Sequence, residues 1–199
     1  VESMTSEEIR RLRLCNVDLT ETFLPLNTFE EVLEHLKNKC ILNLDRSIKI
    51  LDDVMKIVNK HNMADQVLLK SDPSDASLKM VETFAPKVDY MPIFMEEDVA
   101  SEKIENMNIN YIGAELVFKS ESSSIAQDSY IDMMHKKGRI LWGNSIVYSS
   151  RVPLAAGHND DISLTGDPED GWGWLAKKGF DIIQTDWTHH CVNYLRNRY

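Results

Sequence analysis

The sequence predicts an α/β protein built on a parallel sheet. Six short apolar segments alternate along the chain with longer segments in which apolar residues recur at helical spacing. Several of the apolar segments lack strict alternation, which is typical of strands buried on both faces of a parallel sheet. A strand–helix series of this kind joins its strands through right-handed crossovers. The expected strands are 40–45, 67–70, 88–94, 111–118, 139–144 and 180–186.

The segments around these strands carry helix signals. Residues 28–31, Thr-Phe-Glu-Glu, form a capping box that opens a helix through Leu36. Residues 5–8 form another, which opens a helix over 6–14. Further helices are expected over 48–60, from Pro73 to about 85, up to Lys137 before Gly138, over 168–178, and around Tyr194 at the end of the chain.

This pattern alone leaves two architectures open, an open doubly wound sheet or most of a (β/α)₈ barrel. No glycine-rich phosphate loop follows any expected strand, which counts against a nucleotide-binding open sheet. In both architectures, functional groups gather at the carboxyl ends of the strands. Those ends are therefore the place to look for a site.

Composition and charge exclude several classes of protein. The chain has 199 residues, of which 43% are apolar, so it can bury a core and is not a disordered chain. A net charge of −10 disfavours binding to phosphate backbones and anionic lipid, so we expect no nucleic-acid partner. No apolar run approaches the roughly 20 residues of a membrane helix, so no transmembrane segment is expected. The acidic first eight residues do not resemble a signal peptide, and a targeting segment would lie upstream of Val1.

The cysteines make neither a disulfide framework nor a metal motif. Cys15, Cys40 and Cys191 are odd in number and widely spaced. We expect them to be reduced and mostly buried, as free cysteines usually are.

Polar residues recur at the ends of the expected strands. Any single one is explained by a helix cap or a surface ion pair, but their recurrence at equivalent positions favours a functional site. Carboxylates beside a lysine and an amide suit a hard divalent cation, Mg²⁺ or Ca²⁺, and an anionic substrate. The residues are Asp45, Lys70, Glu115, Trp142 with Asn144, and Asp186.

No histidine occupies an expected strand end, although histidine is the usual proton-transfer residue near neutral pH. His158, in the loop 157–161, is the one histidine considered near a site. The loop 148–167 is rich in aspartate but lacks the EF-hand pattern. No histidine pair has a zinc-binding spacing.

Four stretches carry a resemblance to a known family. Residues 141–145 read Leu-Trp-Gly-Asn-Ser, and residues 173–186 end in Ile-Ile-Gln-Thr-Asp. Upstream, residues 24–33 lead into Ile-Leu-Asn-Leu-Asp at 41–45. In order and spacing these stretches resemble the C-terminal part of the catalytic barrel of the glycerophosphodiester phosphodiesterase family, its third to eighth strands, and the resemblance extends over about 2–198.

The resemblance implies a TIM-barrel-like α/β fold with about six of its eight parallel strands present. It implies one domain over 1–199 that is incomplete at its N-terminus. The implied activity is metal-dependent hydrolysis of small-molecule glycerophosphodiesters to an alcohol and glycerol 3-phosphate, a hydrolase reaction of lipid metabolism. The implied roles are metal binding (Mg²⁺ or Ca²⁺) by Asp45, catalysis by Lys70 and Glu115, and substrate binding by Trp142, Asn144 and Asp186.

The sequence departs from the family at its start. The family's His-Arg-Gly strand, its Glu-x-Asp strand and its second histidine do not occur, so this chain alone is expected to be inactive. A non-catalytic barrel remnant that binds a phosphodiester or a partner protein is the alternative. An unrelated α/β hydrolase has little support, because Gly-x-Ser-x-Gly is absent. Two open sheet edges would need a cover, and the helix over 6–14 or a homo-oligomer would supply it.

Overall fold

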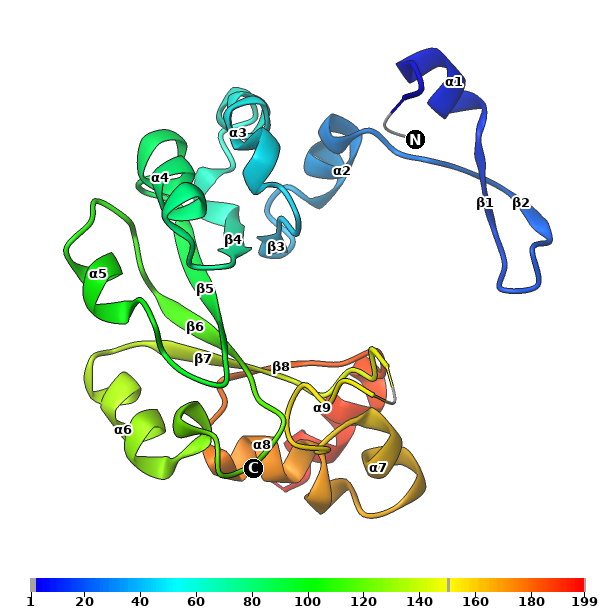
Figure 1. The fold of residues 1–199 in the computed structure, drawn as a ribbon. Coiled ribbons are helices and arrows are strands. Elements are labelled where there is room, and N and C mark those ends of the chain that lie inside the picture. The colour runs from blue at the N-terminus through cyan, green and yellow to red at the C-terminus, as the bar shows by residue number, and fades with distance from the viewer. Residues whose placement is uncertain (1–2, 150, 199) are drawn as a thin grey trace.

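The protein is built on a curled parallel sheet with helices on its outer face (Figure 1). The computed structural model describes residues 3–149 and 151–198. Within them, six strands pair in the order β3-β4-β5-β6-β7-β8, each parallel to its neighbour. The predicted fold class, part of a TIM-like barrel, is confirmed. The strands are β3 (Leu42–Asn43), β4 (Val67–Ser71), β5 (Asp89–Met95), β6 (Gly113–Val117), β7 (Ile140–Asn144) and β8 (Ile182–Gln184).

The helices between the strands follow the sequence signals closely. Thr28 caps its helix as a complete capping box. Two boundaries differ from expectation: the helix expected from Pro73 begins at Asp75 because Ser74 caps it, and the stretch 168–178 divides at Gly171 into a 3₁₀ turn and a helix. The helices are α2 (Phe29–Leu36), α3 (Leu51–Lys60), α4 (Asp75–Phe84), α5 (Ser101–Glu105), α6 (Asp128–Lys136), α7 (Asp160–Thr165), α8 (Trp172–Lys178) and α9 (Thr188–Arg196).

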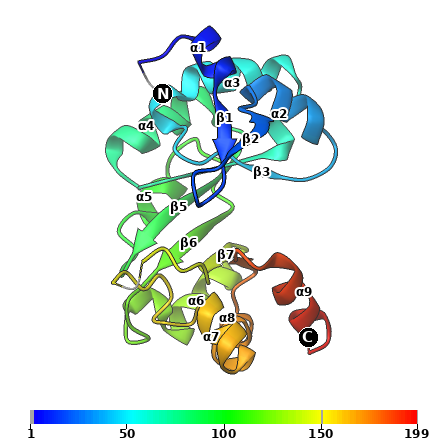
Figure 2. The ribbon, with the colours of Figure 1, turned by 90° about the vertical axis from the view of Figure 1, so that its right-hand side faces the viewer.

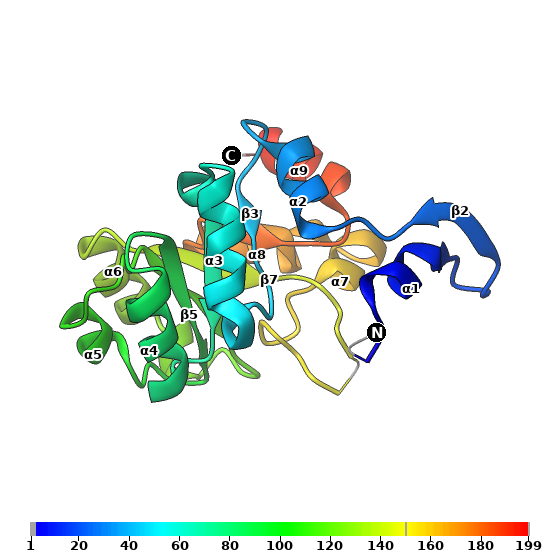
Figure 3. The ribbon, with the colours of Figure 1, turned by 90° about the horizontal axis from the view of Figure 1, so that it is seen from above.

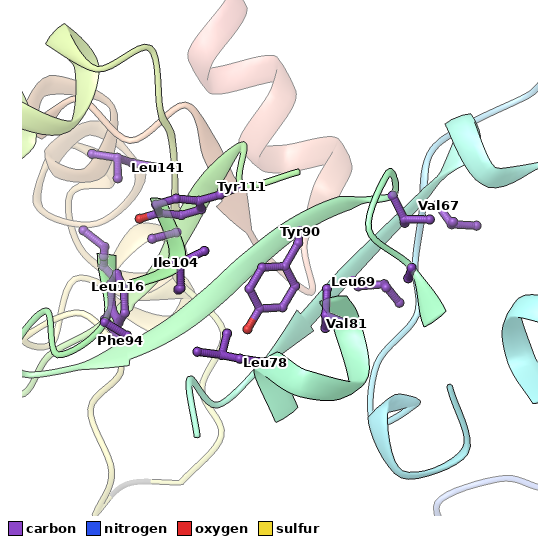
Figure 4. Packing of buried hydrophobic residues seen from close by; sticks show 14 of the residues in the cluster. Val67, Leu69, Leu78, Val81, Tyr90, Phe94, Ile104, Tyr111, Leu116 and Leu141 are labelled. Carbon is purple, nitrogen blue, oxygen red and sulfur yellow. The ribbon is translucent and has the colours of Figure 1, made fainter. Parts of the chain in front are cut away.

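The hydrophobic core lies between the outer face of the sheet and the helices (Figure 4). Side chains alternate between the two faces of each strand, so Tyr90 and Phe94 on β5 and Leu116 on β6 enter this core. Leu78 of α4 and Ile104 of α5 meet them from the helix side. The remaining strand positions point to the concave face, where the candidate site residues lie.

A mostly apolar pocket of about 280 Å³ lies between the strands, toward their amino ends. Figure 2 views the molecule from its open side, and β3 and β8 are the two end strands of the sheet. The pocket is lined by Ile41, Asn43, Leu68, Asp89, Met91, Ile112, Ile140, Trp142 and Ile182.

The N-terminal segment stands away from the sheet (Figures 1 and 3). Helix α1 (Ser6–Arg11) is followed by an antiparallel hairpin of β1 (Arg13–Cys15) and β2 (Glu21–Pro25). The expected helix over 6–14 is therefore too long, because Leu12 already has an extended backbone. No residue of α1 is buried, so the expectation that this helix covers a sheet edge is wrong.

The cysteines are free, but only one of them is buried. Cys191 on α9 is enclosed, and burial, together with nearby Asp160, raises the pKa of its thiol to about 11. Cys15 and Cys40 are exposed, contrary to expectation, because Cys15 lies on the projecting hairpin and Cys40 precedes the edge strand β3.

Within 3–149 and 151–198, none of the helices has the length and hydropathy required to cross a bilayer.

We predict that Gly113 is required for the pairing of β6 with β7. A Cβ at this position would stand 1.9 Å from the Ile140 carbonyl oxygen, which belongs to the paired strand. Gly113→Ala should lower the free energy of unfolding by about 2 kcal/mol or more, measured by urea denaturation. Gly138→Ala is the control, because a Cβ there meets nothing within 4 Å and only the φ of 72° opposes it, at a cost of about 1 kcal/mol. Equal losses in the two variants would contradict the close approach.

Candidate functional site

A buried ion pair joins two strands on the concave face. Lys70 is the next-to-last residue of β4, as predicted, whereas Glu115, predicted at the end of its strand, is the middle residue of β6. Lys70 Nζ of β4 lies 2.7 Å from Glu115 Oε2 of β6, and the two side chains are only 4% and 10% exposed. Asn144 at the end of β7 donates from Nδ2 to the other carboxylate oxygen, Glu115 Oε1, at 2.8 Å. Three of the residues predicted from strand ends thus form one connected group.

The indole of Trp142 shields the ammonium group. Lys70 Nζ lies 3.6 Å from the centre of the Trp142 ring, a cation–π contact that strengthens when the cation is desolvated. Trp142 Nε1 donates to Gln184 Oε1 of β8 at 3.1 Å, which fixes the plane of the ring. We refer to Lys70, Glu115, Trp142 and Asn144 as the Lys70 centre. Gln184 is a supporting residue that the sequence analysis did not single out, although it lies in the Gln-Thr-Asp stretch.

The curl of the sheet brings these residues together. Lys70 pairs in register with Met91 of β5, and Ile93 of β5 pairs with Glu115, so a whole strand separates the lysine from the glutamate. Neighbouring strands lie about 4.8 Å apart, and the lysine side chain crosses β5 on the concave face to reach the glutamate. The side chain of Glu115 points to the concave face, because side chains alternate along a strand and its neighbours Ala114 and Leu116 point into the core.

Lys70 is reached from a pocket at the mouth of the half-barrel. The pocket has a volume of about 470 Å³. Hydrogen bonds from Ser74 hold the pKa of Asp72 below its ordinary value, so this rim carboxylate is charged at neutral pH. Ser71 shares a hydrogen bond with Tyr90, and burial raises the pKa of that phenol to about 12. The lining residues are Asp45, Arg46, Ile48, Lys49, Lys70, Ser71, Asp72, Ser77 and Ile93.

Asp45 lies at the same mouth but outside the Lys70 centre. Its side chain is 67% exposed and lies 3.7 Å from Arg46 Nε. The described residues contain no group of three or more His, Cys, Asp or Glu side chains that could hold a metal ion. The residues present therefore do not form a metal centre by themselves.

Two other candidates lie apart from the Lys70 centre. Asp186 is exposed, and its backbone N–H donates to Asp160 Oδ2 at 3.0 Å. His158 stacks on Trp174 with 3.8 Å between ring centres, and its Nε2 lies 3.1 Å from a Glu121 carboxylate oxygen. This histidine braces the loop after β7 against the outer layer instead of facing the site.

A comparison with protein-family models places the chain. A model described as a domain of unknown function, DUF4996, matches residues 90–195, just over half of the sequence. The chain belongs to the DUF4996 family. The matched segment of this DUF4996 member contains Glu115, Trp142 and Asn144 of the Lys70 centre, and Lys70 lies before it. No curated protein matches the sequence.

Solved structures share the fold of this DUF4996 member. A glycerophosphoryl diester phosphodiesterase from Parabacteroides distasonis matches with a TM-score of 0.70 at 16% identity, over 97% of this chain and 63% of its own. A protein from Galdieria sulphuraria named as a candidate glycerophosphodiester phosphodiesterase matches with a TM-score of 0.67 at 16% identity, over 98% and 71%. A second Parabacteroides distasonis glycerophosphodiester phosphodiesterase gives 0.61 at 15%, over 99% and 73%. The resemblance to this family is thus confirmed at the level of the fold, and the chain spans less than two thirds of the first structure.

We predict strong energetic coupling between Lys70 and Glu115. Removing one partner leaves the other charge buried, so Glu115→Gln and Lys70→Met should each lower the free energy of unfolding by about 3 kcal/mol or more. The double variant should lose much less than the two single losses added together, measured as a double-mutant cycle by urea denaturation. Asp52→Asn, which breaks an exposed ion pair with Lys56, is the control and should change stability little. Additive losses would show that the two side chains do not depend on each other.

Proposed function

We propose that this chain forms the phosphodiester-binding part of a glycerophosphodiester phosphodiesterase. The observation that carries the proposal is the Lys70 centre, a lysine, a carboxylate, an amide and an indole held together at the middle of β6 and the carboxyl ends of β4 and β7. In barrels of parallel strands, the carboxyl end carries the chemistry. The fold shared with the solved phosphodiesterases supports the substrate class.

The lysine is the group that attracts the phosphoryl oxygens. Lys70 lines the mouth pocket, so an anion in this pocket competes with Glu115 for its ammonium hydrogens. Asn144 continues to donate to Glu115 during this exchange, which keeps the carboxylate hydrogen-bonded. Trp142, Asn144 and Asp186 are proposed to bind the alcohol or glycerol part, where an indole face and polar groups suit a polyol.

The groups that move protons are proposed to come from outside the Lys70 centre. None of the histidines, all within the described residues, lies at a strand end: they lie in α2, α6, α9, just after α3 and in the loop before α7. We propose that a further segment or a second copy lies against the open concave face and brings them. The same observation favours a second candidate function, a module that binds phosphodiesters without hydrolysing them.

We predict that the chain binds sn-glycero-3-phosphocholine without turnover. Calorimetry should show binding to the wild type and an affinity about tenfold weaker for Lys70→Gln, because a charged hydrogen-bond donor is lost. Trp142→Phe, which keeps an aromatic ring but cannot donate to Gln184, is a second variant that leaves the ion pair in place. Lys79→Gln, an exposed change on α4, is the control.

An assay for glycerol 3-phosphate separates the two candidate functions. Release by this chain, abolished by a chelator, would show that it holds its own catalytic groups and would exclude the binding module. Absence of binding in the wild type, or equal binding by Lys70→Gln, would contradict the proposed role of the Lys70 centre.

Asp45 is the proposed ligand of a divalent metal, as one member of a set whose other ligands lie outside the described residues. Because one carboxylate does not hold a divalent cation by itself, titration of this chain with Ca²⁺ and with Mg²⁺ should show only weak binding, and Asp45→Asn should remove it. Asp53→Asn is the control, because Asp53 is an exposed carboxylate on the neighbouring helix α3. Equal affinity in the wild type and Asp45→Asn would remove Asp45 from the metal site.

A further inference from the structure

A buried aspartate joins the ends of two strands behind the Lys70 centre. Asp160 is the first residue of α7 and is 2% exposed. Its Oδ1 lies 2.7 Å from the Ser145 hydroxyl, 2.7 Å from the Thr185 hydroxyl and 2.8 Å from Trp172 Nε1. Its Oδ2 accepts from the Asp186 backbone N–H at 3.0 Å. No cation pairs with Asp160 among the residues described, so its charge is balanced by these four hydrogen-bond donors alone.

These donors come from separate parts of the chain. Ser145 directly follows β7, Thr185 and Asp186 directly follow β8, and Trp172 opens α8. The backbone N–H of Asp160 also donates to the Ser145 carbonyl at 2.7 Å. One carboxylate therefore holds the ends of β7 and β8 at a fixed separation and ties both to α8.

The strand end that Asp160 fixes carries the support of the Lys70 centre. Gln184 is the last residue of β8 and precedes Thr185. Its backbone carbonyl accepts from the Ser145 backbone N–H at 2.8 Å, and its side-chain Oε1 accepts from Trp142. Trp142 in turn lies against the Lys70 ammonium. A continuous series of contacts thus leads from Asp160 through Gln184 and Trp142 to Lys70.

We propose that Asp160 is a positioning residue for the Lys70 centre: it sets the end of β8 so that Gln184 holds the Trp142 indole over Lys70. The proposal rests on the proposed function in one respect, that the Lys70 centre is the binding site. Neither the strand-end pattern nor the resemblance assigns this role, because Asp160 opens helix α7, fifteen positions beyond Ser145 along the chain.

An asparagine at this position cannot replace the aspartate. An amide offers one acceptor oxygen and one donor nitrogen, whereas both oxygens of Asp160 face donors. In Asp160→Asn, the side-chain NH₂ group therefore faces at least one hydrogen-bond donor, and that hydrogen bond is lost. The adjacent Asp161 is exposed, so Asp161→Asn makes the same chemical change without these contacts and is the matched control.

The test observes the indole N–H signals of Trp142 and Trp172 by ¹H–¹⁵N NMR, assigned with Trp142→Phe and Trp172→Phe. Asp160→Asn should shift both signals, and Asp161→Asn should shift neither. Thr185→Val removes one of the two hydrogen bonds from the end of β8 to Asp160 and keeps the other, from the Asp186 backbone N–H, together with the one from Trp172. It should therefore shift the Trp142 signal by less than Asp160→Asn does. It also serves as the second variant if Asp160→Asn does not fold.

The proposal is overturned if Thr185→Val, or a folded Asp160→Asn, leaves the Trp142 signal unmoved. Asp160 would then brace α7 and α8 only. Calorimetry with sn-glycero-3-phosphocholine gives the second readout, with an affinity about tenfold weaker expected for Thr185→Val. If the wild type does not bind this diester, the proposed function fails, and the Trp142 signal still decides whether Asp160 positions the indole.

Discussion

The candidate site depends on a single buried interaction, the ion pair between Lys70 and Glu115. An isolated charge in this position would be strongly destabilising, because transfer of an ion out of water costs several kcal/mol. Each charge offsets part of that penalty for the other, and the Asn144 amide and the Trp142 indole add a hydrogen bond and a cation–π contact. The pair also requires curvature, because its partners lie on strands separated by β5.

Much of this arrangement was predictable because it follows from short-range rules. Unbroken apolar runs predicted the parallel strands, and the polar residues from the middle to the carboxyl end of these strands predicted Lys70, Glu115, Trp142 and Asn144 as a group. Parallel strands place their carboxyl ends on one side of a sheet, so no knowledge of contacts was needed. The capping boxes at Thr5 and Thr28 were likewise visible in the sequence, since they depend on residues three positions apart.

Other features escaped prediction because they depend on long-range geometry. The position of Gln184 beside Trp142 is set by the pairing of β7 with β8, and that of Asp160 by a loop whose path has no local signature. Asp45 and Asp186 satisfied the strand-end rule but remain exposed, because each lies beyond the last paired residue of an edge strand. The hairpin 13–25 was missed since Asn-Val-Asp-Leu at its turn lacks the usual glycine.

The order of the strands has a consequence for how the chain folds. The strands of the sheet pair only with their neighbours in the sequence, so each pair is joined by a single crossover. The cost in chain entropy of closing each loop is correspondingly small, and the sheet can grow from its middle outward. The end strands β3 and β8 have one neighbour each, and amide hydrogen exchange should therefore be slowest in β5 and β6 and become faster toward both ends, as in a short repeat array.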